Sequence, residues 1–408
     1  MRTITVVMLI MAAPQTMDPR QTGPRVKGEA SHCPQTTLPS SISHAIHLSA
    51  AYLERACSAT GKFTYRVDTT TGRVAANYNF IRHEGAMYAL SMFNRSHPDR
   101  RAVNAMIRAA SFLRTEYIGT GNQSNMLVVW SQPVAVRSDA ALGAAGLGLV
   151  ALAETERVQP KTIPLDQLRA LGRFIIFLQK PDGSFYSRYR ADLGPDGGWQ
   201  SLYYTGEATL GLIALYEVEH SREWLIAAGK ALSYLARSRV SIQEPPPDHW
   251  ALIATARFLP YYEKSSCPAS RKELLTHAAR ICEGFLGQQR MLTQDATLSG
   301  SFDPEGRTTP TATRLEGLLA ALEFLPEDTA GQRARIERAI RPAIAFLLRA
   351  QIASGQYAGE IPRALVRAVG GEPRAQEVRI DYVQHALCAW LRFQAWVSTP
   401  PPMLKPVK

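Results

Sequence analysis

Cysteine is scarce in this sequence, and its spacing argues against two kinds of stabilised site. The 408 residues contain five cysteines, and none belongs to a Cys-x-x-Cys pair. An odd, widely spaced set argues against a disulfide framework and against a cysteine-based zinc site. A single disulfide between Cys267 and Cys282 stays open because the two are close in sequence. Cys388 lies in an apolar segment, where a small core residue is expected.

Long hydrophobic runs are also lacking. The apolar stretch 4–13 is too short to span a bilayer as a helix, so no stable membrane span is expected. One arginine before this stretch, and small residues at its end, fit a secretory signal peptide. We therefore expect a leader and disordered segment over residues 1–38, and a periplasmic or secreted protein. The alternative is an ordinary disordered leader on a cytoplasmic protein.

Alternating strand patterns are a third absence, and helix-forming segments dominate instead. Hydrophobic residues make up 46% of the chain, which is ample for a large core and too many for disorder. The sequence therefore predicts an all-α protein. Its domain is expected over residues 39–398, with a Pro/Lys tail at 399–408.

The charge balance is basic, at +11 from 46 Lys and Arg against 35 Asp and Glu. The simplest interpretation is an arginine-rich surface, and the alternative is an anionic partner such as an acidic polysaccharide. Nucleic acid is the least favoured partner, because the basic residues are spread along several helices without an accompanying motif. Nothing in the sequence indicates an oligomeric state.

Two kinds of helix alternate along the chain from about residue 40. The first kind is amphipathic and carries Arg or Glu on one face, which predicts an outer position. The second kind is nearly free of charge and rich in Gly and Ala, which predicts a buried inner position. The outer helices are predicted at 45–59, 100–117, 165–179, 221–237, 271–289 and 332–351.

An acidic residue marks the start of each inner helix. These markers lie 41 to 68 residues apart, which indicates an internal repeat of helical hairpins. Such repeats bury a continuous core only when they stack or close on themselves. The six markers are Glu84, Asp139, Glu207, Asp248, Glu316 and Asp381.

A second repeated sequence pattern follows several of the outer helices. Gly61, Gly183, Gly300 and Gly355 each precede an aromatic residue by one or two positions. Glycine permits a turn with positive φ, after which the aromatic side chain packs back on the core. These residues are expected to be fold signals.

Six outer–inner hairpins with these repeated patterns resemble an (α/α)6 toroid over about residues 40–397. Six-hairpin glycosidases, polysaccharide lyases, sugar epimerases, terpenoid cyclases and protein prenyltransferases share that architecture, and no single family is assigned. The resemblance implies that the inner-helix starts line a substrate funnel. Fold alone does not give function.

Three ionisable residues, Arg82, His83 and Glu84, open the first inner helix. Such a helix has little exposed face, and a buried charge needs partners. We expect these side chains and Asp139 to line a site, with a helix cap and its ion-pair partner as the alternative. Trp199, after two glycines, is expected on a flexible rim.

Aromatic residues accompany the acids of the third and fourth inner helices. Apolar sugar faces stack on aromatic rings while sugar hydroxyls bond to a carboxylate. The alternatives are a helix-terminal charge above core tyrosines, and Asp248 as a helix cap only. The substrate-binding residues expected here are Tyr203, Tyr204, His249 and Trp250.

Asp381 and His385, in the sixth inner helix, are four residues apart and share one face. This spacing suits a metal or an acid–base pair. A metal needs a third ligand and none is evident from spacing, so no metal and no cofactor are expected. The residues expected to bind substrate on the fifth and sixth helices are Arg314, Glu316, Arg379, Asp381, Tyr382 and His385.

The predicted function is a carbohydrate-active, glycoside hydrolase-like enzyme acting on a poly- or oligosaccharide, with an acidic glycan favoured by the charge. Two carboxylates would act as general acid and base. Glu84, Glu207 and Asp248 are the catalytic candidates.

Three alternatives stay open. A uronate lyase or sugar epimerase would use His83 or a tyrosine as base, with Arg82 or Arg379 neutralising a uronate. The sequence gives little support for isoprenoid chemistry, because it lacks the Asp-x-Asp-Asp and Asp-x-Cys motifs of toroids with that activity. A non-catalytic toroid would bind a glycan or help to assemble an envelope polymer.

Overall fold

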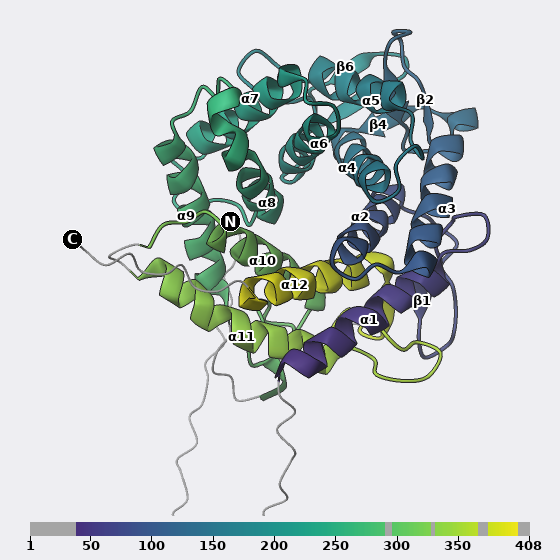
Figure 1. The fold of residues 1–408 in the computed structure, drawn as a ribbon, viewed down its shortest axis with the longest axis vertical. Helices are drawn as coiled ribbons and strands as arrows, with labels where there is room; N and C mark the ends of the chain where they lie inside the picture. The colour runs from purple at the N-terminus through teal and green to yellow at the C-terminus, as the bar shows by residue number, and fades with distance from the viewer. Residues whose placement is uncertain (1–37, 290–295, 328–330, 366–373, 399–408) are drawn as a thin grey trace, which may run out of the picture. The chain divides into compact units, whose positions relative to one another are not determined.

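The structure, a computed structural model, describes residues 38–289, 296–327, 331–365 and 374–398. Residues 1–37 of the predicted leader, the predicted tail and Cys33 lie outside these residues, whereas Leu38 begins the first helix. Twelve α-helices in the described residues alternate between an outer and an inner layer, as predicted (Figure 1). The outer helices are α1 (Leu38–Ala56), α3 (Arg100–Glu116), α5 (Leu165–Phe177), α7 (Arg222–Ser238), α9 (Arg271–Gln288) and α11 (Gln332–Ala350).

The inner helices form a closed ring. Each inner helix contacts the next one, and the last contacts the first, so the fold is an (α/α)6 toroid. Their bounds are α2 (Phe80–Ser96), α4 (Leu142–Val158), α6 (Tyr204–Glu219), α8 (His249–Phe258), α10 (Thr308–Leu322) and α12 (Ile380–Ser398). No described helix is long and apolar enough to cross a membrane.

Glycines let the inner helices approach closely, as their composition predicts. A Cβ on Gly146 of α4 would lie 2.5 Å from the backbone nitrogen of Ala208 in α6. A Cβ on Gly211 of α6 would lie 2.7 Å from the carbonyl oxygen of Gly146. Any larger side chain would therefore push α4 and α6 apart.

The glycine turns after the outer helices tie neighbouring hairpins together. Gly61, Gly183 and Gly300 have φ values of 89°, 90° and 86°, which confirms the predicted positive φ. A Cβ on each would lie 2.0 to 2.3 Å from a carbonyl oxygen of the next outer helix, in α3, α7 and α11 respectively. Gly359 makes the same approach to Leu48 of α1, at 2.1 Å, and so links the sixth hairpin to the first.

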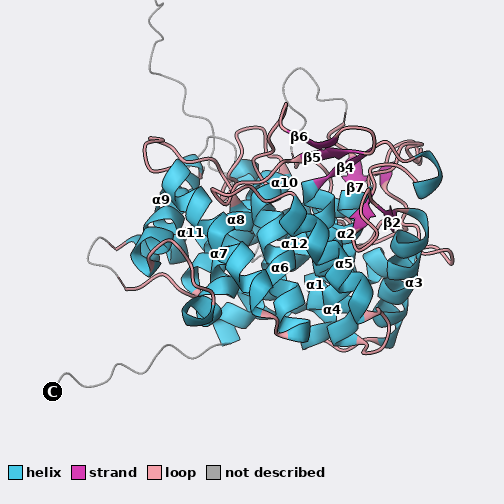
Figure 2. Ribbon diagram, turned by 90° about the horizontal axis from the view of Figure 1, so that it is seen from above, coloured by secondary structure: helices cyan, strands magenta, loops and turns pink. Residues whose placement is uncertain are grey.

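Short antiparallel strands lie in the loops at one end of the helical layer (Figure 2). β1 (Arg66–Asp68) pairs with β7 (Glu377–Arg379), with Val67 opposite Val378, and thereby joins the first and last hairpins. The other strands are β2 (Ile118–Thr120) with β3 (Leu127–Val129), and β4 (Asp139–Ala141) with β5 (Arg188–Arg190) and β6 (Gly194–Asp196). Short 3₁₀ helices are η1 (Val134–Val136), η2 (Leu259–Lys264) and η3 (Ala296–Leu298).

The candidate disulfide between Cys267 and Cys282 is not formed, and both thiols are free. Cys282 is fully buried in α9, where it packs as a small apolar residue. Cys388 is fully buried in α12, as its apolar surroundings predict.

Candidate functional site

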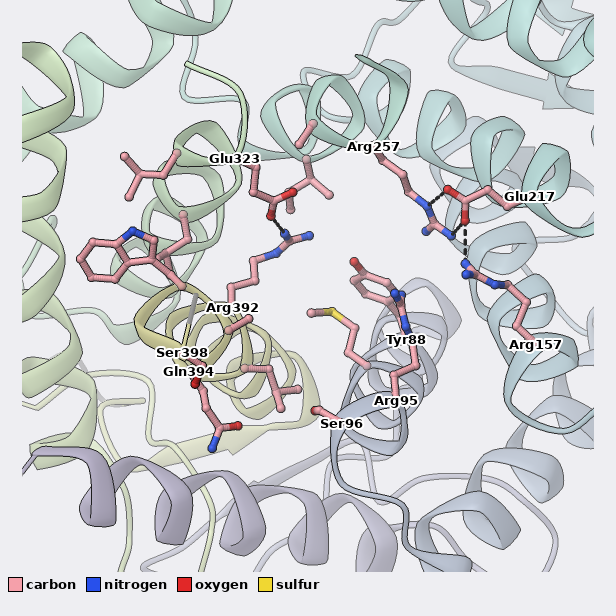
Figure 3. Close-up of a pocket in the computed structure, with 18 of the residues that line it drawn as sticks. Tyr88, Arg95, Ser96, Arg157, Glu217, Arg257, Glu323, Arg392, Gln394 and Ser398 are labelled. Atoms are coloured by element: carbon pink, nitrogen blue, oxygen red, sulfur yellow. Dashed lines mark hydrogen bonds and ion pairs between the residues drawn. The ribbon is translucent and has the colours of Figure 1, made fainter. Parts of the chain in front are cut away.

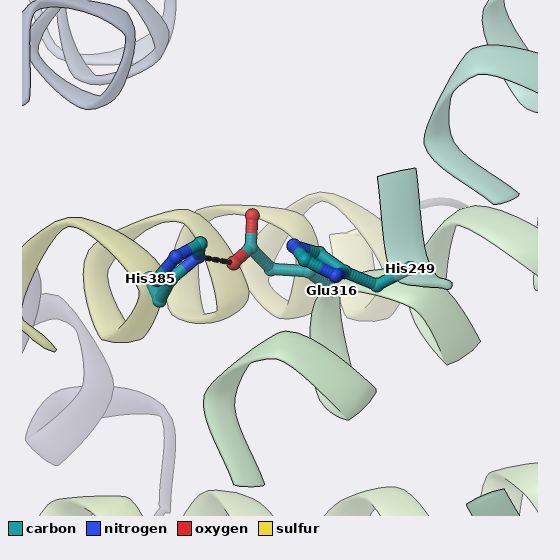
Figure 4. A group of neighbouring side chains, drawn as sticks. All are labelled: His249, Glu316 and His385. Atoms are coloured by element: carbon teal, nitrogen blue, oxygen red, sulfur yellow. Dashed lines mark hydrogen bonds and ion pairs between the residues drawn. The ribbon is translucent and has the colours of Figure 1, made fainter. Parts of the chain in front are cut away.

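Three side chains from three inner helices meet near the strand-bearing end of the ring (Figure 4). His249 is the first residue of α8, Glu316 lies in α10 and His385 in α12. The Nδ1 atom of His385 lies 2.6 Å from Oε1 of Glu316, and ligand atoms of all three residues lie within 4.8 Å of one another. The two imidazole centroids are 5.5 Å apart. We call these residues the His–Glu–His cluster.

Part of the cluster has unused hydrogen-bonding capacity. Both ring nitrogens of His249, and Oε2 of Glu316, are buried without a hydrogen-bond partner in the described part of the chain. Buried polar atoms are normally satisfied, so unpartnered ones call for an explanation such as a ligand or a catalytic role. These atoms therefore mark the place where a bound molecule would supply the missing partners.

Burial determines the protonation of His249. It lowers the pKa of this imidazole well below its usual value, and the nearby charges of His385 and Arg314 act in the same direction. A neutral imidazole carries a lone pair on one nitrogen and can accept a proton. His249 is therefore a neutral imidazole at neutral pH, and its lowered pKa makes it a weaker base than an exposed histidine.

The cluster also has the donor set of a divalent metal site. Two imidazoles and one carboxylate are ligands that zinc and similar ions accept. Spacing indicated only Asp381 and His385 as a pair, whereas the fold joins His385 with His249 and Glu316. A ligand on another helix is invisible to spacing, which is why the sequence indicated no third ligand.

Aromatic rings surround the cluster. The ring of Trp250 lies 4.8 Å from that of His249 and 6.2 Å from that of His385. Tyr203 meets His249 edge-on at 5.7 Å. Trp250 is only 3% exposed, so it forms an apolar floor beneath the imidazoles.

Glu207 and Glu84 form a second group of buried acids. Burial raises the pKa of Glu207 to about 8. The negative charge of Asp248 adds to this effect, and the positive charge of Arg82 opposes it. Burial, with a contribution from Glu207, also raises the pKa of Glu84 well above its usual value. Glu207 is therefore mostly protonated at neutral pH, and burial favours the protonated form of Glu84 as well.

These two acids pack against glycines of α4. A Cβ on Gly143 would lie 2.3 Å from Oε2 of Glu207, and one on Gly148 would lie 2.9 Å from Oε1 of Glu84. Oε2 of Glu207 and both carboxyl oxygens of Glu84 are buried without a hydrogen-bond partner among the described residues. The ring wall thus supplies little polar compensation, which is why burial dominates their pKa.

Asp248 caps α8, which is the alternative to a catalytic role that the sequence left open. Its Oδ1 accepts a hydrogen bond from the Ala251 backbone at 3.0 Å, and its Oδ2 accepts one from Arg239 at 2.9 Å. Arg239 and Asp248 are both buried. These contacts account for its burial without a substrate, and nothing in the spacing of the sequence points to Arg239 as a partner.

Asp381 is held by two arginines. Arg82 donates to it at 3.0 Å, and Arg379 donates through Nε at 2.5 Å and Nη2 at 2.8 Å. Although burial opposes ionisation, these two cations hold the pKa of Asp381 below its usual value. Arg379 also lies over the ring of Tyr382, at 4.5 Å. The sequence analysis expected these four residues to line the funnel. In the structure the two arginines bind Asp381, and the Tyr382 hydroxyl donates to Glu377 at 3.1 Å.

His83 faces the outer helix α3 rather than the cluster. Its Nε2 lies 3.0 Å from the carbonyl oxygen of Ala109, and its Nδ1 lies 2.7 Å from the Tyr78 hydroxyl. Its ring packs against Phe112. Burial lowers its pKa to about 4, so it is neutral and satisfied by protein contacts.

The remaining predicted residues lie in a strand, in a loop and in the helix α10. Asp139 lies in β4, three residues before α4, and accepts hydrogen bonds from Ser138 and Gln132. Trp199 is 47% exposed and meets Tyr204 edge-on at 5.6 Å. Arg314 is half-buried in α10 and donates to Gln288 at 3.1 Å.

Comparisons with known proteins bear on the fold. No family model matches the sequence, and no curated protein does. A sugar epimerase from a ruminal bacterium superposes with a TM-score of 0.65 at 10% identity, covering 87% of this chain and 98% of that one. The cellobiose 2-epimerase of Bacillus thermoamylovorans has a TM-score of 0.66 at 12% identity, covering 88% and 99%.

Glycosidases share the architecture too. A family 76 α-mannanase from Bacteroides thetaiotaomicron has a TM-score of 0.58 at 9% identity, covering 88% of this chain and 97% of that one. At such low identities the likeness is one of fold. The chain therefore has the (α/α)6 toroid fold that sugar epimerases and glycoside hydrolases share.

Proposed function

We propose that this protein is a carbohydrate-active enzyme that moves a proton at the carbon beside the carbonyl group of a sugar, as an epimerase or isomerase does. The observation that carries the proposal is the His–Glu–His cluster. It combines a neutral His249 that has no hydrogen-bond partner in the described residues with a second imidazole, His385, bonded to a carboxylate. Two positioned imidazoles can accept a proton and return it to a bound substrate.

The proposed step balances without a redox change. One imidazole removes the proton from carbon 2 of an open-chain sugar, and the electron pair of that C–H bond moves to the carbonyl, whose oxygen takes up a proton. Return of a proton to the other face of carbon 2, with loss of the proton on the oxygen of carbon 1, restores the carbonyl and yields the epimer. Return to carbon 1, with loss of the proton on the oxygen of carbon 2, yields the ketose isomer. No oxidant or reductant is needed.

The cluster geometry suggests a role for each residue. Glu316 accepts a hydrogen bond from Nδ1 of His385, which leaves the lone pair of that ring on Nε2. Neutral His249 is the second proton acceptor. Glu207, protonated at neutral pH, is a hydrogen-bond donor for a sugar oxygen.

The fold comparisons support the same direction, because the structures of similar fold include a sugar epimerase, a cellobiose 2-epimerase and a D-mannose isomerase. Hydrolysis by Glu84 and Glu207 has less support. A glycosidase needs one ionised and one protonated carboxyl group. Burial raises the pKa of both of these acids, and Asp248 is bound to Arg239.

A uronate lyase also has less support from the described contacts. Arg82 and Arg379, the residues expected to neutralise a uronate, both donate to Asp381. His83, the expected base, is satisfied by Tyr78 and Ala109. Neither role is therefore free in this arrangement.

The test is hydrogen exchange at carbon 2. Purified protein is incubated in D₂O with reducing monosaccharides and disaccharides, and NMR follows deuterium entry and new epimers or ketoses. We expect exchange with the wild type, and a loss of about 10²–10⁴-fold in His249→Asn and His385→Asn. His44→Asn, at an exposed position of α1, is the matched control and should exchange normally.

Two results would contradict the proposal. One is release of new reducing ends, or of unsaturated uronate, from oligosaccharides without any deuterium entry. The other is exchange that survives both histidine substitutions. Exchange abolished by adding divalent zinc and restored by a chelator would fit the proposal, since a metal on the same nitrogens removes their lone pairs.

A further inference from the structure

A cavity lies at the end of the ring opposite the starts of the inner helices (Figure 3). Its volume is about 1240 Å³. Its lining includes Arg95, Arg157 and Arg257 in the last turns of α2, α4 and α8, and further residues from earlier turns and from the outer helix α11. We call it the arginine cavity. Its size is ample for a small organic molecule.

Two aromatic rings separate the arginine cavity from the His–Glu–His cluster. Tyr88 lines the cavity and is 3% exposed, and Trp250, which contacts His249, is also 3% exposed. Their ring centroids lie 6.2 Å apart. A molecule in the arginine cavity would therefore not touch the cluster.

Positive charge predominates in the lining. Five arginines and two glutamates line the cavity, the acids being Glu217 and Glu323. Arg157 donates to Glu217 at 2.6 Å and to the buried Glu154 at 3.3 Å, and Arg257 donates to the same two acids. These two arginines are thus neutralised within the wall.

Two other arginines retain donor capacity. Arg95 is 52% exposed at its side chain, and the carboxylate atom with which it forms an ion pair, on Glu154, lies 3.8 Å away. Arg392 donates to Glu323 at 2.9 Å, while its Nε is buried without a hydrogen-bond partner in the described segments. Figure 3 shows Arg95, Arg392 and Tyr88 around the same space.

The helix dipole explains only part of this arrangement. Arg95, Arg157 and Arg257 lie in the last turns of their helices, where cations are favoured. Arg392 lies six residues before the end of α12, so the dipole does not account for it. Its unpartnered Nε points instead to a missing acceptor.

We propose that the arginine cavity binds a small organic anion, a carboxylate or a phosphate ester, between Arg95 and Arg392. Guanidinium groups match the planar oxygens of such anions through paired hydrogen bonds. Apolar side chains of Ile253, Leu319 and Leu391 in the same lining receive the carbon skeleton. This inference does not depend on the proposed reaction at the other end of the ring.

The test is calorimetric titration with phenyl phosphate, citrate and inorganic phosphate at one fixed ionic strength. Phenyl phosphate should bind with one-to-one stoichiometry, and more tightly than inorganic phosphate because its ring buries apolar surface. Arg95→Gln and Arg392→Gln should each weaken binding about tenfold or more, as expected for a charge-assisted hydrogen bond. Arg338→Gln, exposed on the outer helix α11, is the control and should bind normally.

Arg392→Lys guards against a folding artefact, because it keeps a cation beside Glu323 but loses the planar fork. It should retain the unfolding midpoint of the wild type and still bind phenyl phosphate more weakly. The proposal is overturned if none of the three anions binds at millimolar concentration. It is also overturned if Arg338→Gln weakens binding as much as Arg95→Gln and Arg392→Gln do.

Discussion

Buried glutamates occur at both ends of the ring, and they differ in charge. Glu84, near the starts of the inner helices, and Glu154, near their ends, are both fully buried. Burial raises the pKa of Glu84, whereas Arg257, Arg157 and Arg95 hold the pKa of Glu154 below its usual value despite burial. The charge of a buried acid therefore depends on whether the fold brings a cation to it.

This difference in charge distinguishes the two ends of the ring. Near the helix starts, Glu84, Glu207 and His249 are all expected to be neutral, because burial dominates there. Neutral, unpartnered groups of this kind are able to exchange protons with a substrate. Near the helix ends, Glu154 and Glu217 are tied to arginines and are suited to holding charge in place.

The largest expected effect is the pH dependence of stability that Glu207, near the starts of the inner helices, produces. The pKa of Glu207 is about 8 in the folded protein and ordinary in the unfolded chain, so the folded state holds more protons between about pH 4.5 and 8. Its stabilising contribution is fully present below the unfolded pKa and is lost as the pH rises through 8. The loss is of order 5 kcal/mol at most.

Urea unfolding at pH 5 and pH 8.5 measures this dependence. Glu207→Gln, which stays neutral at both pH values, should reduce the difference between the two midpoints. Asp139→Asn is the control, because hydrogen bonds from Ser138 and Gln132 hold the pKa of this half-buried acid below its usual value despite burial. An unchanged difference in Glu207→Gln would show that Glu207 titrates normally.

The second-largest effect on stability is expected when the charge of Glu154, near the ends of the inner helices, is removed. Glu154→Gln leaves the partly buried Arg257 with Glu217 alone, and removing the buried acid from such a network costs about 3–5 kcal/mol. Unfolding by denaturant at pH 7 should show a clearly lower midpoint. A shift of under about 0.5 kcal/mol, the usual range for surface changes, would mean that Glu154 is not ionised in the fold.

A smaller effect is expected from Gly146→Ala. The added Cβ would meet the α6 backbone at 2.5 Å and force α4 and α6 apart, for about 1–3 kcal/mol. The displacement should also admit water to Glu207 and bring its pKa down toward the usual value. Gly287→Ala in α9, where the new Cβ meets nothing within 4 Å, is the control and should be neutral or slightly stabilising.

The smallest effect is expected for Glu84→Gln at neutral pH. Glutamine has nearly the shape of the protonated acid, so the midpoint should move by under about 1 kcal/mol. Paired with Glu154→Gln, this substitution is the sharpest test of the comparison between the two ends. Equal and large shifts in both variants would remove the distinction.

Periodicity carried much of the fold prediction. The order of outer and inner helices follows from alternating amphipathic and chargeless segments, and the turns with positive φ follow from glycine before an aromatic residue. The first outer helix starts earlier than expected, at Leu38. Pro39 is tolerated there because the first turn of a helix needs no internal hydrogen bond from its backbone nitrogens.

The candidate site was predictable as a list of residues and not as a set of contacts. His249, Glu316 and His385 were each expected to line a funnel, yet only the closed ring brings them within 4.8 Å. Asp248 and Asp381 carry similar signals in sequence, and the structure pairs them with Arg239, Arg82 and Arg379. Sequence spacing reports neighbours on one helix, whereas these pairs join different parts of the chain.

The sequence by itself determined the repeated outer and inner helices, and the places where glycine is required, because local periodicity and backbone sterics act within a few residues. Only the tertiary structure decided which ionisable groups are charged. Glu84 and Glu154 have the same side chain and the same burial, and they differ in the cations that distant helices bring within reach. A pKa shift depends on the three-dimensional surroundings of a group, and those surroundings exist only once the ring has closed.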